Sequence, residues 1–248
     1  MNESRLDYAV IIPARYASSR LPGKPLVELC GVPMVVRTYH QCIKACPPER
    51  VHVATDDDRI ASVCHAHGIS VVMTSADCLT GTDRVAECAA QLKADIFVNV
   101  QGDEPVFEPA DLTRFLGYVE RHPGEVLNGV CPIADEQLFY SPATPKVVMR
   151  PDGRLLYMSR SPIPGSKAQN FSTGWRQVCV YSFPRSALEA FSSCQEKTPL
   201  EAVEDIEILR FLELGWEVRM VPLSAESIAV DNQDDIARAE AAIRDRGL

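Results

Sequence analysis

The 248-residue sequence lacks several features that define common protein classes. No apolar run approaches the roughly 20 residues that span a bilayer, and residues 1–7 lack the basic and then apolar pattern of a signal peptide. The nine cysteines are scattered and contain no CxxC pair, which argues against a disulfide framework or a zinc ribbon. A GxxxxGK phosphate loop and a GxGxxG motif are also missing. We therefore expect a cytoplasmic protein with no membrane partner.

Positive charge is also scarce. Lys and Arg total 25 against 34 Asp and Glu, a formal net charge of −9, which argues against nucleic acid as a partner. An anionic small substrate would need a local basic pocket. Hydrophobic residues make up 46% of the chain and aromatic residues 7%, the composition of an ordinary globular protein of one large or two small domains.

Short apolar runs alternate along most of the chain with segments whose apolar residues recur at helical spacing. Runs typical of buried strands span 8–12, 51–55 and 95–100, and helical stretches span 34–45, 58–67 and 83–92. This alternation predicts an α/β fold with a mostly parallel central sheet. Sites in such sheets collect in the loops after the strands, here residues 13–24, 56–58 and 101–105.

The pattern becomes richer in strands after a helical stretch at 109–120. Short strands are expected at 146–149, 155–158 and 177–183, and helices at 200–214 and 234–246. No internal repeat or linker separates these segments. We predict a single α/β domain over residues 1–248 with an inserted or appended substrate-binding lobe.

Three cations, Arg15, Arg20 and Lys24, fall in the loop that follows the first predicted strand. Guanidinium forks and an ammonium group can hold phosphate oxygens, and backbone N–H groups near Gly23 can complete an anion-binding nest. On spacing alone, a solvated basic loop is the alternative. The concentration of positive charge in an acidic protein favours polyphosphate binding.

Two aspartates also follow apolar runs. Asp103 comes after the strand at 95–100, where Gly102 allows close backbone approach, so its carboxylate can face a bound triphosphate and Mg²⁺. It could instead form a turn. Asp231 precedes a predicted helix and could be its N-terminal cap. The residues alone do not decide whether Asp103 and Asp231 bind a metal or only form a turn and a helix cap.

The segment from Val10 to Pro33 resembles the cytidylyltransferases that activate the sugar acid 3-deoxy-manno-octulosonate (Kdo). The likeness continues through residues 54–57, 73–75, 81–84, 99–105, 146–148 and 157–164, so it covers nearly the whole chain. It implies the three-layer α/β/α, GT-A-like and Rossmann-like fold of nucleotide-diphospho-sugar transferases. It also implies a nucleotide-binding core over about 8–130 and 200–248 and a strand-rich substrate and dimerisation lobe over about 131–199.

The resemblance further implies a reaction and its site. The anomeric hydroxyl of a 2-keto-3-deoxy sugar acid attacks the α-phosphorus of CTP and pyrophosphate departs, with Mg²⁺ as cofactor and a homodimer as the assembly. Lys24, Asp103 and Asp231 would be catalytic, with the two aspartates as metal ligands. The nucleotide would contact Arg15, Ser19, Arg20, Lys24, Arg84 and Gln101, and the sugar acid Gln101, Arg160, Gln177, Tyr181, Glu207 and Ile208.

Three of these residues can also be interpreted from their chemistry alone. Arg160 ends an otherwise apolar strand, and its guanidinium suits the carboxylate of a sugar acid. Arg84 is equally well explained as a surface arginine at the start of a helix. Tyr181 alone would more often pack in the core or across strands.

The sequence departs from the family on the sugar side. Gln177 and Cys179 stand where the family has histidine and glycine, and Ile208 stands where it has glutamine. A helix over 200–214 would put Glu204, Glu207 and Ile208 on one face. Because a lost hydrogen-bonding partner can change specificity strongly, an amino-modified or nine-carbon ulosonic acid is one hypothesis. Continued use of Kdo, with Gln177 replacing the histidine, is the other.

A GT-A-type glycosyltransferase and a non-catalytic nucleotide-binding protein are the competing functions. The contiguous basic loop that contains Arg15, Arg20 and Lys24 disfavours the first. The presence of Lys24, Asp103 and Asp231 together disfavours the second.

Overall fold

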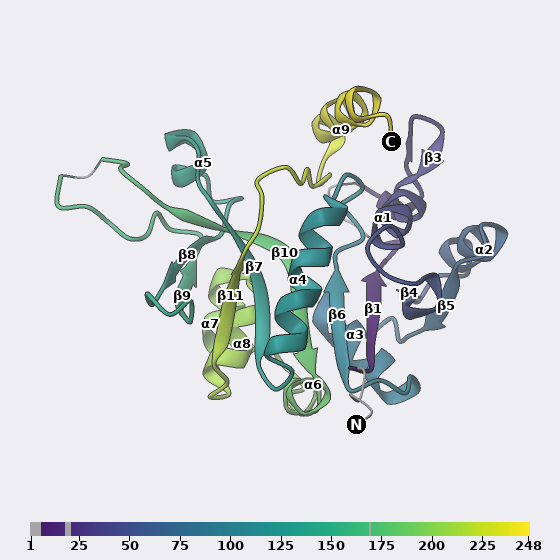
Figure 1. Ribbon diagram of the computed structural model, residues 1–248, viewed down its shortest axis with the longest axis horizontal. Coiled ribbons are helices and arrows are strands. Elements are labelled where there is room, and N and C mark those ends of the chain that lie inside the picture. The colour runs from purple at the N-terminus through teal and green to yellow at the C-terminus, as the bar shows by residue number, and fades with distance from the viewer. Residues whose placement is uncertain (1–5, 18–20, 169) are drawn as a thin grey trace.

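The computed structural model describes residues 6–17, 21–168 and 170–248. Its main sheet has the strand order β11-β7-β10-β6-β1-β4-β5, and helices cover both of its faces (Figure 1). These strands are β1 (Tyr8–Pro13), β4 (Val51–Thr55), β5 (Ser70–Met73), β6 (Ile96–Val100), β7 (Val126–Pro132), β10 (Trp175–Pro184) and β11 (Val218–Pro222). The predicted three-layer α/β fold is confirmed.

Alternate residues of the central strands face opposite helical layers. Along β1, Val10 and Ile12 pack in one apolar cluster and Ala9 and Ile11 in the other. The first layer contains α1 (Met34–Cys42), α2 (Asp58–Ala66) and α4 (Pro109–Arg121), and the second contains α3 (Gly81–Gln91), α6 (Arg185–Ser192) and α8 (Ile208–Glu213). Burial on both faces explains why these strands are apolar throughout.

The seven strands from β11 to β5 are parallel except for β10. Parallel pairs join β1 to β4 and β6, β4 to β5, and β7 to β11, whereas β10 runs antiparallel between β6 and β7. This strand lies within the range 131–199 that we predicted for the lobe, yet the structure places it in the main sheet. The remaining lobe comprises α5 (Glu136–Tyr140), β8 (Lys146–Met149) and β9 (Leu155–Ser159), joined to β10 through β8.

The prediction of one helix over 200–214 is wrong. The helix α7 (Pro199–Glu204) ends at Asp205, whose backbone is left-handed (φ 51°, ψ 50°), and α8 begins at Ile208. Aspartate adopts this conformation more readily than most residues because its short side chain can form local hydrogen bonds. Glu204 and Ile208 therefore do not share the face of one continuous helix.

The last helix, α9 (Gln233–Arg246), packs on the hairpin of β2 (Glu28–Leu29) and β3 (Val32–Pro33). Ile243 and Leu29 are among the buried residues of this separate apolar cluster. Two short 3-10 helices, η1 (Lys24–Leu26) and η2 (Pro48–Arg50), complete the elements of the described chain. None of the helices in those residues is both apolar enough and long enough to cross a membrane.

Candidate active site

A cavity of about 620 Å³ opens at the carboxyl ends of β1 and β6. Residues from both ends of the sequence meet there, as expected for strand-end loops of a parallel sheet. The predicted site residues that line it are Arg15, Lys24, Arg84, Gln101, Asp103, Arg160, Gln177, Tyr181, Glu207 and Asp231. Ser19 and Arg20 lie outside the described residues, so their assignment stays a prediction.

Lys24 lies between two carboxylates at one end of the cavity. Its Nζ is 2.6 Å from Asp103 Oδ2 and 3.2 Å from Asp231 Oδ1. Burial alone would lower the pKa of Lys24, but the charges and hydrogen bonds of the two aspartates outweigh it and raise that pKa. The turn that presents Lys24 depends on Gly23, whose φ of 67° is left-handed. The ammonium group therefore remains charged.

Asp103 is brought to this point by a close approach of two strand ends. A Cβ atom on Gly102 would lie 2.6 Å from the carbonyl oxygen of Pro13, too close for any side chain. Glycine is thus required where the loop after β6 crosses the end of β1. This crossing sets the position of the neighbouring Asp103 carboxylate.

Asp231 is positioned by the segment between β11 and α9. The Val230 N–H donates to the carbonyl of Asp103 at 2.9 Å, and the Ser227 hydroxyl donates to the carboxyl of Glu104. Burial raises the pKa of Glu104 to about 8, and the charge of Asp103 adds to the rise. The loop that carries Asp103 therefore also holds the segment that carries Asp231.

The two aspartates fit a magnesium ion as a partial ligand set. Both carboxylates already contact one cationic group, and their hard oxygens match the preference of Mg²⁺. Among the described residues, no group of three or more His, Cys, Asp or Glu side chains could hold a metal. Phosphate oxygens and water would have to complete the octahedron, which is usual for Mg²⁺ at phosphate sites.

Arg84 and Gln101, predicted to contact the nucleotide, both line the cavity. Arg84 is 3% exposed; its guanidinium lies 3.2 Å from Asp56 Oδ1 and donates to the Thr74 hydroxyl. It lies on α3 but is not the surface arginine that the sequence alone allowed. A Cβ on Gly81 would lie 3.0 Å from the Gln101 side-chain nitrogen, so this glycine leaves room for the amide.

The residues predicted to bind the sugar acid lie just after β9, in β10 and after α7. The Arg160 guanidinium donates to the carbonyls of Pro142 and Asp205 at 3.0 and 2.8 Å. Gln177 donates from its side-chain nitrogen to Asn128 Oδ1 at 2.9 Å, which orients its amide in the wall. Tyr181 is 6% exposed and stacks on Phe183, so it both packs in the core and lines the cavity.

Two of the predicted sugar-binding residues have other contacts than we expected. Glu207 lines the cavity, but its carboxylate accepts hydrogen bonds from the Gly81 and Thr82 N–H groups at 3.2 and 2.9 Å, so it anchors the start of α3. Ile208 is 1% exposed and packs in the core. Ile206 lines the cavity in its place, because the backbone turns at Asp205.

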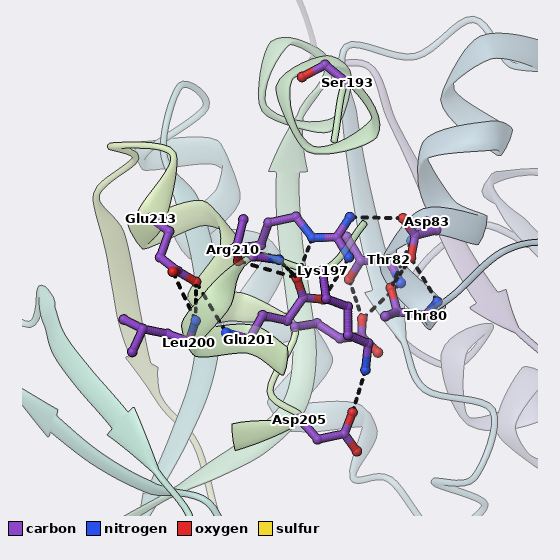
Figure 2. A network of polar contacts seen from close by, with 12 residues as sticks. Thr80, Thr82, Asp83, Ser193, Lys197, Leu200, Glu201, Asp205, Arg210 and Glu213 are labelled. Carbon is purple, nitrogen blue, oxygen red and sulfur yellow. Dashed lines mark hydrogen bonds and ion pairs between the residues drawn. The ribbon is translucent and has the colours of Figure 1, made fainter. Parts of the chain in front are cut away.

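A buried ion-pair cluster joins α3 to α7 and α8 beside the cavity (Figure 2). The fully buried Arg210 donates to the two Glu201 oxygens at 2.6 and 2.7 Å and to Asp83 Oδ1 at 3.1 Å. Asp83 also accepts from the N–H and hydroxyl of Thr80, completing the cap of α3. The cluster therefore fixes the cavity-lining start of α3.

Lys197 and Asp205 also line the cavity, and neither was predicted from the sequence. Lys197 stands in the loop before α7, and Asp205 in the break between α7 and α8. Neither belongs to a motif that the resemblance covers. Helical spacing over 200–214 also concealed the break that exposes Asp205 to the cavity.

The sheet order, the strand-end cavity and a lysine between two carboxylates are typical of an α/β nucleotidyltransferase. The family model described as cytidylyltransferase matches residues 9–222. The 3-deoxy-manno-octulosonate cytidylyltransferase of Geobacter metallireducens is 44% identical over 246 residues, covering 93% of this chain and 95% of that protein. The mitochondrial enzyme of the same name from Arabidopsis thaliana is 36% identical, with 96% and 83% covered.

Solved structures give the same result. CMP:2-keto-3-deoxy-manno-octonic acid synthetase complexed with CTP superposes with a TM-score of 0.90 at 33% identity, covering 97% of this chain and 99% of that one. The chain therefore belongs to the 3-deoxy-manno-octulosonate cytidylyltransferase family. HddC from Yersinia pseudotuberculosis, at 13% identity and a TM-score of 0.70 with 95% and 99% covered, shares the fold.

Proposed function

We propose that the protein transfers CMP from CTP to the anomeric hydroxyl of Kdo and releases pyrophosphate. The observation that carries this proposal is Lys24, held between Asp103 and Asp231 in the same cavity as Arg160. The first group suits a triphosphate with its metal, and the second suits the carboxylate of a sugar acid. The family to which the chain belongs supports the pairing of these two substrates.

In the proposed reaction, the anomeric oxygen forms a bond to the α-phosphorus, and the bond from that phosphorus to the oxygen bridging to the β-phosphate breaks. The hydroxyl proton is lost to solvent or a nearby base, and the electron pair of the broken bond leaves with pyrophosphate. Arg15 and Lys24 hold the triphosphate and offset its growing negative charge. Gln101 and Arg160 orient the sugar acid for in-line attack.

Asp103 and Asp231 would hold Mg²⁺, which supplies Lewis-acid polarisation of the phosphates and orients them. Lys24 contacts the same carboxylates and can also reach a phosphate oxygen bound beside them. Its raised pKa keeps it protonated as a donor throughout the neutral range. The side chains of Tyr181 and Cys179 stay uncharged, because burial holds the pKa of each well above its ordinary value.

A second candidate substrate is an amino-modified or nine-carbon ulosonic acid. Cys179, Ile206 and Gln177 line the sugar side of the cavity, and two of these differ from the residues expected in the family. The hydrogen bond from Gln177 to Asn128 favours Kdo, since it keeps an oriented polar group where the family has histidine.

The proposal also includes a location and an assembly. We place the protein in the cytoplasm, since CTP is an intracellular nucleotide, and we propose that it forms a homodimer. Exposed apolar side chains on α5 and β9, Leu138, Tyr140 and Leu156, support an interface on the strand-rich lobe. Sedimentation equilibrium of the wild type and of Leu156→Asp tests this assembly. We expect a dimer for the first and a shift to monomer for the second.

Steady-state pyrophosphate release tests which nucleotide and which sugar acid the protein uses. Purified protein with Mg²⁺ is assayed with CTP, UTP, ATP and GTP, each against Kdo, 8-amino-Kdo and sialic acid. We expect the highest kcat/KM with CTP and Kdo. A higher value with another acid selects the second candidate, and no CTP-dependent release with any acid contradicts the proposed function.

A further inference from the structure

Two cations lie beside one carboxylate at the end of the cavity that we assign to the sugar acid. Lys197 Nζ lies 2.5 Å from Asp205 Oδ1, and the Arg160 guanidinium lies 3.9 Å from Asp205 Oδ2. The Lys197 hydrogen bond, opposed by partial burial, lowers the pKa of Asp205 together with the charges of Lys197, Arg160 and Arg15. Two cationic side chains therefore share one exposed carboxylate at this point of the wall.

The other acids nearby are committed to different donors. Glu204 accepts from the Ser159 hydroxyl at 2.6 Å and from the Arg160 N–H at 2.8 Å. Glu207 accepts from the N–H groups at the start of α3. Asp205 is thus the carboxylate that pairs with Lys197 in the described part of the chain.

The backbone of Asp205 is held by hydrogen bonds, whereas its carboxylate is exposed to water. Its N–H donates to the Glu201 carbonyl at 2.8 Å, and its own carbonyl accepts from Arg160 at 2.8 Å. The side chain is 71% exposed, and that of Lys197 is 30% exposed. Figure 2 shows the ion pair between Lys197 and Asp205. Because water reaches its carboxylate, the pair is screened and Lys197 can exchange its partner.

We propose that Lys197 binds the carboxylate of the sugar acid together with Arg160, and that Asp205 competes with the substrate for Lys197. The inference rests on the proposed function, because it takes a sugar acid as the ligand. Asp205 occupies the place of the substrate carboxylate and leaves Lys197 when the substrate binds. Lys197 and Asp205 thereby set the affinity for anionic sugars.

The test is a set of variants assayed for the KM of each substrate separately. Lys197→Met removes a charge-assisted hydrogen bond to the substrate and should raise the KM for Kdo about tenfold or more while the KM for CTP changes less than about twofold. Lys197→Arg should restore most of the affinity. Asp205→Asn should lower the KM for Kdo, since asparagine accepts the left-handed backbone but not the competing charge.

The double variant separates competition from simple structural damage. In the Lys197→Met background, Asp205→Asn should lower the KM for Kdo much less than it does in the wild type, because only the more distant Arg160 remains beside Asp205. Lys93→Met, an exposed lysine that does not line the cavity, is the matched control and should leave both KM values unchanged. Thermal melting of every variant checks that the fold is intact.

The outcomes distinguish this inference from the proposed function. If the wild type prefers another ulosonic acid, that acid replaces Kdo in the same measurements. An active wild type whose KM for the sugar acid is unmoved by Lys197→Met overturns the inference alone. A wild type that consumes no sugar acid with CTP overturns both.

Discussion

Replacing Arg210 by methionine should destabilise the protein strongly. Methionine fills much of the same space but removes the charge that both Glu201 oxygens contact, and neither Arg210 nor Glu201 is exposed. The variant leaves the Glu201 carboxylate buried without its ionic partner. It also loses the bond to Asp83 and the packing of the guanidinium on the Phe191 ring, at 3.7 Å from its centroid.

The magnitude follows from the burial of the pair. Removing one partner of a buried ion pair costs about 3–5 kcal/mol. For a chain of this length each kcal/mol lowers the melting temperature by roughly 2–4 °C, so Arg210→Met should melt roughly 6–20 °C below the wild type. The exposed Arg150, which pairs with Asp152 at 2.9 Å, provides the control. Arg150→Met should destabilise the protein far less than Arg210→Met, because water screens its ion pair.

Urea unfolding followed by circular dichroism measures the free energy of unfolding of each variant. The double variant Arg210→Met/Glu201→Leu removes both charges and should recover most of the stability that the single variant loses, because no unpaired carboxylate remains. Our interpretation of the cluster is refuted if Arg210→Met costs no more than Arg150→Met. It is also refuted if the double variant is no more stable than the single one.

Two further predictions concern the loop after β6 and the start of α3. Gly102→Ala forces a shift between its Cβ and the Pro13 carbonyl and should lower kcat by about tenfold to a hundredfold, whereas Gly124→Ala, where a Cβ meets nothing within 4 Å, should leave kcat unchanged. Burial raises the pKa of Glu207 above 4.5 in the folded protein. The protonated Glu207 therefore contributes its full stability below about pH 4.5, and this contribution is lost as the pH rises through the pKa of Glu207 in the folded state. Urea unfolding from pH 4.5 to 8 should therefore show wild type losing stability relative to Glu207→Gln, and a constant difference would contradict this.

Local sequence patterns predicted the α/β layers of the fold and the meeting of two loops at the cavity. Apolar runs buried on both faces identified β1, β4 and β6, and the rule for parallel sheets brought the loops with Lys24 and Asp103 to one edge. Asp231 joined them only through the family resemblance. Its position depends on a hydrogen bond from Val230 to the Asp103 carbonyl, a long-range contact that no local pattern encodes.

The sugar side was less predictable because it depends on one backbone conformation. Helical spacing continues across 200–214, but the left-handed Asp205 ends α7 and changes the direction of the chain before α8. Ile206 therefore lines the cavity while Ile208 enters the core. The antiparallel insertion of β10 between β6 and β7 was equally hidden, since strand order is set by tertiary pairing.

The most direct test of the proposed reaction is an identification of all its products. Protein, Mg²⁺, CTP and Kdo are incubated together, and the products are identified by mass spectrometry and quantified by phosphorus NMR. We expect one CMP-linked sugar acid and one pyrophosphate for each CTP consumed. Conversion of CTP to CMP or CDP without a sugar adduct would contradict the proposed transfer.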